Sequence, residues 1–142
     1  MQDGMQERTA KMEAVNLIGF IGDNLDDQHR LFSIMEEKIG QIIARKSDDQ
    51  YLVILPGLFP FVGVEVNELN VVPDGMIAYL IPEDEYVIFR FEERHIGDFW
   101  DSICTIDNQI RYNIDLSKPR YEIFTSNLQS AGFTEWYIPT KS

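Results

Sequence analysis

The segment 118–124 places one carboxylate among large apolar side chains. If the segment is an extended strand, Tyr121 and Ile123 point to one face, and Glu122 and Phe124 to the other. Two interpretations of Glu122 stay open: its face is wet, or its carboxylate lies at the base of an aromatic cavity. Burying an unpaired charge is costly, so the second interpretation requires a partner, which a cationic ligand would supply.

Aromatic residues on or beside the expected strands could form the walls of such a cavity, and their ring faces attract cations. Tyr137 is a candidate neighbour of Glu122, because a buried tyrosine hydroxyl needs a hydrogen-bond partner. Trp100 lies on the apolar stripe of an expected helix, where a tryptophan is more often part of the core than a ligand contact. The candidate ligand-binding residues are Glu122, Tyr137, Phe124, Tyr51, Phe61 and Trp100.

Other reactive side chains form no recognisable site. His29 and His95 are isolated, and the single cysteine, Cys104, excludes a disulfide within the chain. No zinc-type ligand set, catalytic triad or glycine-rich phosphate loop is present in the sequence. We therefore predict no catalytic residue, no metal and no cofactor.

The composition is strongly acidic, with 24 acidic and 12 basic residues giving a net charge of −12 over 142 residues. This charge argues against direct binding to nucleic acid or to an anionic membrane surface. The start of the chain is polar, and no apolar run approaches the roughly 20 residues that span a bilayer. We expect a cytoplasmic protein with one domain.

The order of expected elements repeats: strand, helix, strand, strand, twice. We expect residues 1–12 to be a disordered tail and 13–142 to form the domain, with repeat one at about 13–72 and repeat two at about 76–140. In repeat one, a strand at 14–21 precedes a helix that runs to about Lys46 and a strand at 51–55. In repeat two, a strand at 86–92 precedes a helix with Ile96, Phe99, Trp100, Ile103 and Ile110 as its apolar stripe.

Two such βαββ units can pair into one antiparallel sheet with both helices on one face. The fold class expected is therefore α+β, a tandem βαββ repeat with a ligand cleft between the repeats. Small-molecule sites favour seams of this kind.

Several motifs of the second half resemble one family. They are Ile81-Pro82, Tyr86-Val87-Ile88-Phe89-Arg90-Phe91, a helix with Trp100, the stretch 119–124, and Glu135-Trp136-Tyr137-Ile138-Pro139. Together they resemble the GyrI-like small-molecule-binding family, the effector-binding domain of bacterial transcription activators. The resemblance implies a stand-alone member whose cleft binds lipophilic, often cationic, molecules. It assigns the family's counter-charge glutamate to Glu122 and the aromatic residue of its final strand to Tyr137.

Three functions follow as hypotheses. The leading one is a binding domain for a lipophilic or cationic small molecule, acting as a sensor, sequestering or regulatory protein. The second is a hydrolase of electrophilic toxic molecules, with Glu122 as general base and Tyr137 orienting water. The third is an acidic interaction protein similar to gyrase inhibitors, and a protein partner or a homodimer stays open.

Overall fold

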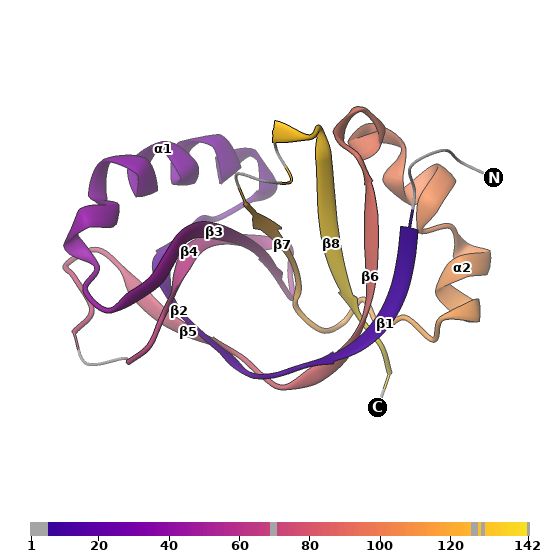
Figure 1. Cartoon of the computed structure of the whole chain (residues 1–142), viewed down its shortest axis with the longest axis horizontal. Coiled ribbons are helices and arrows are strands. Elements are labelled where there is room, and N and C mark those ends of the chain that lie inside the picture. Colours follow the sequence, from indigo (N-terminus) through magenta and orange to yellow (C-terminus); the bar gives the residue numbers. More distant parts are fainter. Residues whose placement is uncertain (1–5, 69–70, 126–127, 129, 142) are drawn as a thin grey trace.

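A computed structural model describes residues 6–68, 71–125, 128 and 130–141. These residues form one antiparallel sheet of eight strands (Figure 1). The strands are β1 (Gln6–Met12), β2 (Val15–Ile21), β3 (Arg45–Leu55), β4 (Phe59–Val66), β5 (Ile77–Ile81), β6 (Asp84–Glu92), β7 (Arg120–Phe124) and β8 (Phe133–Pro139). The helical segments are η1 (Leu25–Asp27), α1 (Gln28–Lys38), η2 (Ile39–Gln41), η3 (Glu93–Asp98), η4 (Phe99–Ile103) and α2 (Ile106–Arg111).

The two βαββ units meet in the middle of the sheet. The strand order is β1-β6-β8-β7-β3-β4-β2-β5, and pairing of β3 with β7 joins the two halves. On one face of the sheet, Leu31 and Met35 of α1 pack against the first half, and Phe99 and Ile103 of η4 pack against the second. The expected α+β fold, with both helical regions on one face, is confirmed.

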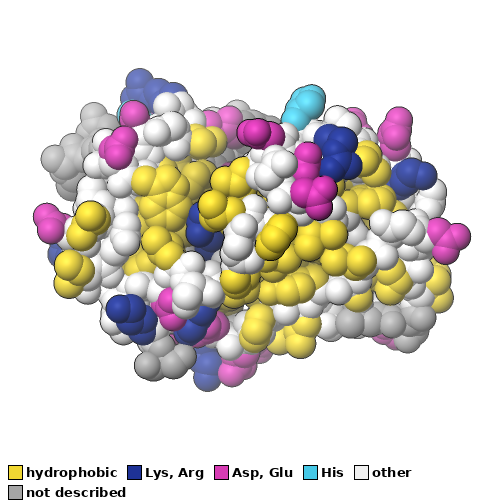
Figure 2. Space-filling model, turned by 180° about the vertical axis from the view of Figure 1, so that it is seen from behind, with side chains coloured by type: hydrophobic (Ala, Val, Ile, Leu, Met, Phe, Trp, Pro, Cys, Tyr) yellow, Lys and Arg dark blue, Asp and Glu magenta, His cyan; other side chains and the backbone are white. Residues whose placement is uncertain are grey.

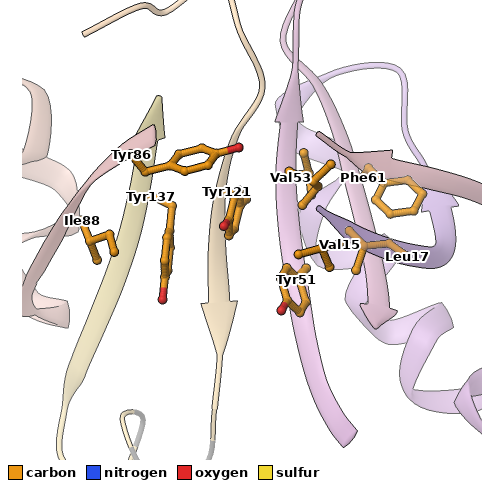
Figure 3. Close-up of a cluster of buried hydrophobic side chains, with 10 residues drawn as sticks. Val15, Leu17, Tyr51, Val53, Phe61, Tyr86, Ile88, Tyr121 and Tyr137 are labelled. Carbon is orange, nitrogen blue, oxygen red and sulfur yellow. The ribbon is translucent and has the colours of Figure 1, made fainter. Parts of the chain in front are cut away.

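The sheet is strongly curved, and the face that lies opposite the helical regions is enclosed. The chain passes directly from β1 to β2 and from β5 to β6, while β1 pairs with β6 and β2 pairs with β5. These strands form a bent two-stranded ribbon that runs from one end of the sheet to the other (Figure 1). Inside the curve lies an apolar cluster of Val15, Leu17, Tyr51, Val53, Phe61, Ile81, Tyr86, Ile88, Tyr121 and Tyr137, most of which Figure 3 shows. We call this the inner cluster.

The prediction of a disordered tail is wrong for residues 6–12, which form β1; residues 1–5 lie outside the described part. The strand is at the edge of the sheet, and its side chains are mostly exposed and polar, so its hydrophobic pattern is weak. Its order comes from the ladder with β6, from the packing of Ala10 and Met12 against the inner cluster, and from an ion pair between Arg8 and Glu135 (3.1 Å).

The first helix is shorter than expected. Asn24 starts the region, since its side chain accepts a hydrogen bond from the Asp26 backbone N–H (3.0 Å). The helix α1 ends at Lys38, and the strand β3 begins at Arg45. Arg45 still compensates the helical carboxyl end, because its Nη1 donates to the carbonyl oxygens of Ile39 and Ile42, both at 2.8 Å.

The second helix is divided into η3, η4 and α2, so the expected continuous apolar stripe is only partly correct. Phe99 and Ile103 are buried against the sheet. The side chain of Thr105 accepts a hydrogen bond from the backbone of Asn108, which starts α2 as a separate helix. Ile110 therefore points away from the core and is 75% exposed.

Figure 2 shows hydrophobic side chains gathered across the middle of one side of the molecule and acidic side chains placed mainly around its outline. Among the described residues, none of the helices is sufficiently long and apolar to traverse a bilayer.

Candidate functional site

A cavity of about 330 Å³ lies at the seam between the two halves. Its floor is formed by β3, β7 and β8, and its sides by the start of the first helical region and by η3 and η4. Most of its walls are apolar. The lining residues are Leu25, Gln28, Leu52, Ile54, Ile96, Trp100, Arg120, Tyr121, Glu122, Phe124, Trp136 and Ile138.

The strand β7 contributes the charged residues of this seam cavity. Because side chains alternate along a strand, Arg120, Glu122 and Phe124 project to the same face. Glu122 pairs in register with Leu52 of β3 and Trp136 of β8, so both halves of the molecule surround it. The prediction that Glu122 and Phe124 share a face is confirmed.

Glu122 is only 7% exposed, so the interpretation of a wet strand face is wrong. The hydroxyl of Thr134 donates a hydrogen bond to Oε2 of Glu122. Burial raises the pKa of Glu122 to about 7, although the Thr134 hydroxyl and the nearby Trp136 indole favour the charged form and the charge of Glu93 opposes it. The carboxylate is therefore divided between its neutral and ionised forms near neutral pH.

No Lys, Arg or His among the described residues forms an ion pair with Glu122. The indole Nε1 of Trp136 is also buried, and it completes no hydrogen bond with a described residue. The ionised carboxylate thus keeps acceptor capacity on the cavity side of the sheet, where a ligand group could use it.

Aromatic rings form one wall of the cavity. Trp100 is 37% exposed and stands edge-on to Phe99 (4.9 Å between ring centroids). The ring centroid of Trp136 lies 4.2 Å from that of Phe99 and 6.5 Å from that of Trp100. The only two tryptophans of the chain therefore border the same cavity, which makes indole fluorescence a direct reporter of its contents.

The structure brings together three of the six predicted site residues: Glu122, Phe124 and Trp100. Tyr51, Phe61 and Tyr137 lie in the inner cluster, on the other face of the sheet (Figure 3). The ring of Tyr137 stacks on that of Tyr121, with centroids 4.6 Å apart, and its hydroxyl lies 3.4 Å from Oε1 of Glu135.

The prediction that Tyr137 neighbours Glu122 is wrong, because Trp136, not Tyr137, stands opposite Glu122 in the β7–β8 register. Adjacent residues of a strand point to opposite faces, so a shift of one position exchanges the indole for the phenol. Tyr137 is therefore not placed to orient water beside Glu122, the role that the hydrolase hypothesis gave it.

Arg120 is a cavity residue that the sequence prediction missed. Its Cζ lies 5.0 Å from the ring centroid of Trp100, a cation–π contact, and burial lowers the pKa of its guanidinium. The signal was available in the sequence, since Arg120 has the same strand parity as Glu122 and Phe124. Leu25, Gln28 and Ile96 had no comparable signal, because only the folded chain brings them to the seam.

Within the described ranges, no three His, Cys, Asp or Glu side chains come together in an arrangement that could hold a metal ion. The polar side chains that line the cavity include the carboxylate of Glu122, the guanidinium of Arg120 and the amide of Gln28.

Comparison with solved structures identifies the same fold in other proteins, whereas no protein-family model and no curated protein matches the sequence. SAV2435 bound to tetraphenylphosphonium has a TM-score of 0.71 at 12% identity, with 96% of this chain and 94% of that chain covered. The C-terminal domain of EcmrR has a TM-score of 0.68 at 12% identity, covering 97% and 98%.

An integron cassette protein from the mobile metagenome of Vibrio cholerae has a TM-score of 0.59 at 12% identity, covering 98% of this chain and 97% of that chain. At such low identity these likenesses concern the fold. The chain has the GyrI-like fold that the sequence resemblance implied.

Proposed function

We propose that this chain, with its GyrI-like fold, binds a lipophilic cation in the seam cavity and uses Glu122 as the counter-charge. The observation that carries the proposal is a carboxylate 7% exposed at an apolar cavity, with no ion pair to a basic side chain among the described residues. A buried charge without a partner is unfavourable, and a bound cation would supply that partner. The role is that of a sensor or sequestering protein.

The walls of the cavity support the lipophilic part of the proposal. Leu52, Ile54 and Ile138 offer aliphatic contacts, while Trp100 and Trp136 offer ring edges and faces. A ligand with aromatic groups would bury apolar surface on both halves of the molecule at once. Tetraphenylphosphonium is a suitable probe, because its charge is permanent and screened by four phenyl rings, and because SAV2435, which has the same fold, was solved with it.

The test is titration of tetraphenylphosphonium by calorimetry and tryptophan fluorescence at pH 8. We expect Glu122→Gln to weaken binding about tenfold or more, which corresponds to about 1.4 kcal/mol. Glu37→Gln removes the same charge from an exposed position on α1 and should leave the affinity unchanged. Equal affinities of the wild type and Glu122→Gln would contradict the role of Glu122 as counter-charge.

The protonation state of Glu122 gives a second measurement. Its pKa is raised to about 7, so the site is partly protonated at pH 7, and a cation favours the ionised form. Binding at pH 7 should therefore release about half a proton, and affinity should rise as the pH increases through 7. Calorimetry in two buffers with different ionisation enthalpies measures the released proton, which should disappear in Glu122→Gln.

A further inference from the structure

The seam cavity contains a permanent cation of its own. Arg120 lies two residues before Glu122 on β7, and both side chains line the cavity. The guanidinium of Arg120 rests over the ring of Trp100 at 5.0 Å. It forms no ion pair with any acidic side chain in the part of the chain that the structure describes.

The two opposite charges are not in direct contact: among the described residues, no ion pair joins the guanidinium of Arg120 to the carboxyl of Glu122. The cavity therefore offers one negative and one positive contact, separated by two strand positions, which is about 6–7 Å along β7.

The position of Arg120 also affects where a ligand cation can bind. One face of the Trp100 ring is covered by the guanidinium of Arg120, so a ligand cation at that face would have to displace Arg120 and meet a like charge. Glu122 is then the favourable place for the ligand's cation. Arg120, whose planar guanidinium can donate two parallel hydrogen bonds, is the favourable place for a carboxylate or phosphonate.

We propose that the preferred ligand is a lipophilic zwitterion, with its cationic centre at Glu122 and an acidic group, about 6–7 Å away, at Arg120. This inference rests on the proposed function, because it assigns the cation to the same carboxylate. It adds Arg120 as the residue that determines specificity between zwitterions and simple cations.

The experiment compares two probes that differ only in the acid. They are (4-carboxybutyl)triphenylphosphonium, a zwitterion, and its methyl ester, a simple cation with the same rings. In calorimetry at pH 8, we expect the wild type to bind the zwitterion about tenfold more tightly than the ester. Equal binding of both probes, or tighter binding of the ester, would overturn the assignment of Arg120.

Variants separate this inference from the proposed function. Arg120→Gln should lose the preference for the zwitterion and bind the ester at least as well as the wild type does. Glu122→Gln should weaken the ester and retain the preference for the acid. Arg111→Gln, an exposed control with the same change in net charge, should bind both probes like the wild type.

The possible failures can be told apart. If the ester binds and depends on Glu122 while the acid gives no advantage, the proposed function stands and the zwitterion inference fails. If neither probe binds the folded wild type, both fail. The decisive comparison uses the wild type alone, so it does not depend on the folding of any variant.

Discussion

Glu122 is harder to ionise in the folded chain than in the unfolded chain, because the sheet and the cavity walls exclude water from its carboxyl group. Its pKa is about 7 when folded, against an ordinary value of 4.5. Between these values the folded chain binds more protons than the unfolded chain. Proton binding by Glu122 therefore stabilises the folded chain. This contribution is fully present below about pH 4.5 and is lost as the pH rises through 7.

Replacing Glu122 by Gln should remove this pH dependence. The difference in pKa corresponds to roughly 3 kcal/mol of unfolding free energy, which the wild type should lose relative to Glu122→Gln between pH 4.5 and pH 8. Urea denaturation at both pH values measures the difference. A constant difference between wild type and variant over this range would show that ionisation of Glu122 carries no folding penalty.

The strands β2 and β4 approach each other closely where the sheet curves. Gly19 of β2 stands opposite Gly63 of β4 in the register. A Cβ added at Gly19 would lie 1.9 Å from the carbonyl oxygen of Val62, a distance that the backbone cannot accept without moving. A Cβ added at Gly63 would lie 2.6 Å from the ring of Phe61 and 3.0 Å from the carbonyl oxygen of Ile18, so there is little room for a side chain at either position.

Gly19→Ala should consequently destabilise the fold by at least about 2 kcal/mol, since backbone atoms must separate. Gly40→Ala is the matched control: a Cβ there would have no atom within 4 Å, so the unfolding free energy should change little. Urea midpoints of the two variants provide the comparison. A Gly19→Ala protein as stable as Gly40→Ala would mean that the strands can separate at little cost.

At the scale of the whole molecule, the net charge of −12 surrounds a cavity that we propose receives a cation. An acidic surface attracts cations over a distance of about one Debye length, roughly 10 Å at 0.1 M salt. A contact buried at the seam is screened much less. A protein partner and a homodimer remain predictions from the sequence.

Salt should therefore slow the association of tetraphenylphosphonium several-fold between about 10 mM and 300 mM and leave its dissociation rate almost unchanged. Stopped-flow fluorescence of the two cavity tryptophans measures both rates. An association rate independent of salt would argue that the surface charge has no part in capture, whatever the role of Glu122.

A structural feature can be predicted from the sequence when it depends on residues that are close together in the chain. The alternation of β7 is local, so the common face of Glu122 and Phe124 follows from the residues, and the same parity identifies Arg120. The repetition of strand, helix, strand, strand predicts the sheet and its two helical regions. The strand β1, whose hydrophobic pattern is weak, and the division of the second helix are harder to predict from the sequence, because each depends on contacts with distant elements.

The sequence by itself determined the acidic composition, the two βαββ units and the side chains that β7 presents on each face, because these depend on residue type and on periodicity within a few positions. Only the tertiary structure decided that Glu122 is buried and that Trp136, rather than Tyr137, stands beside it. The tertiary structure also decided that Tyr51 and Phe61 belong to the inner cluster and not to the cavity. Each of these depends on register and on sheet curvature, which pair residues far apart in the chain and which a one-position shift would reverse.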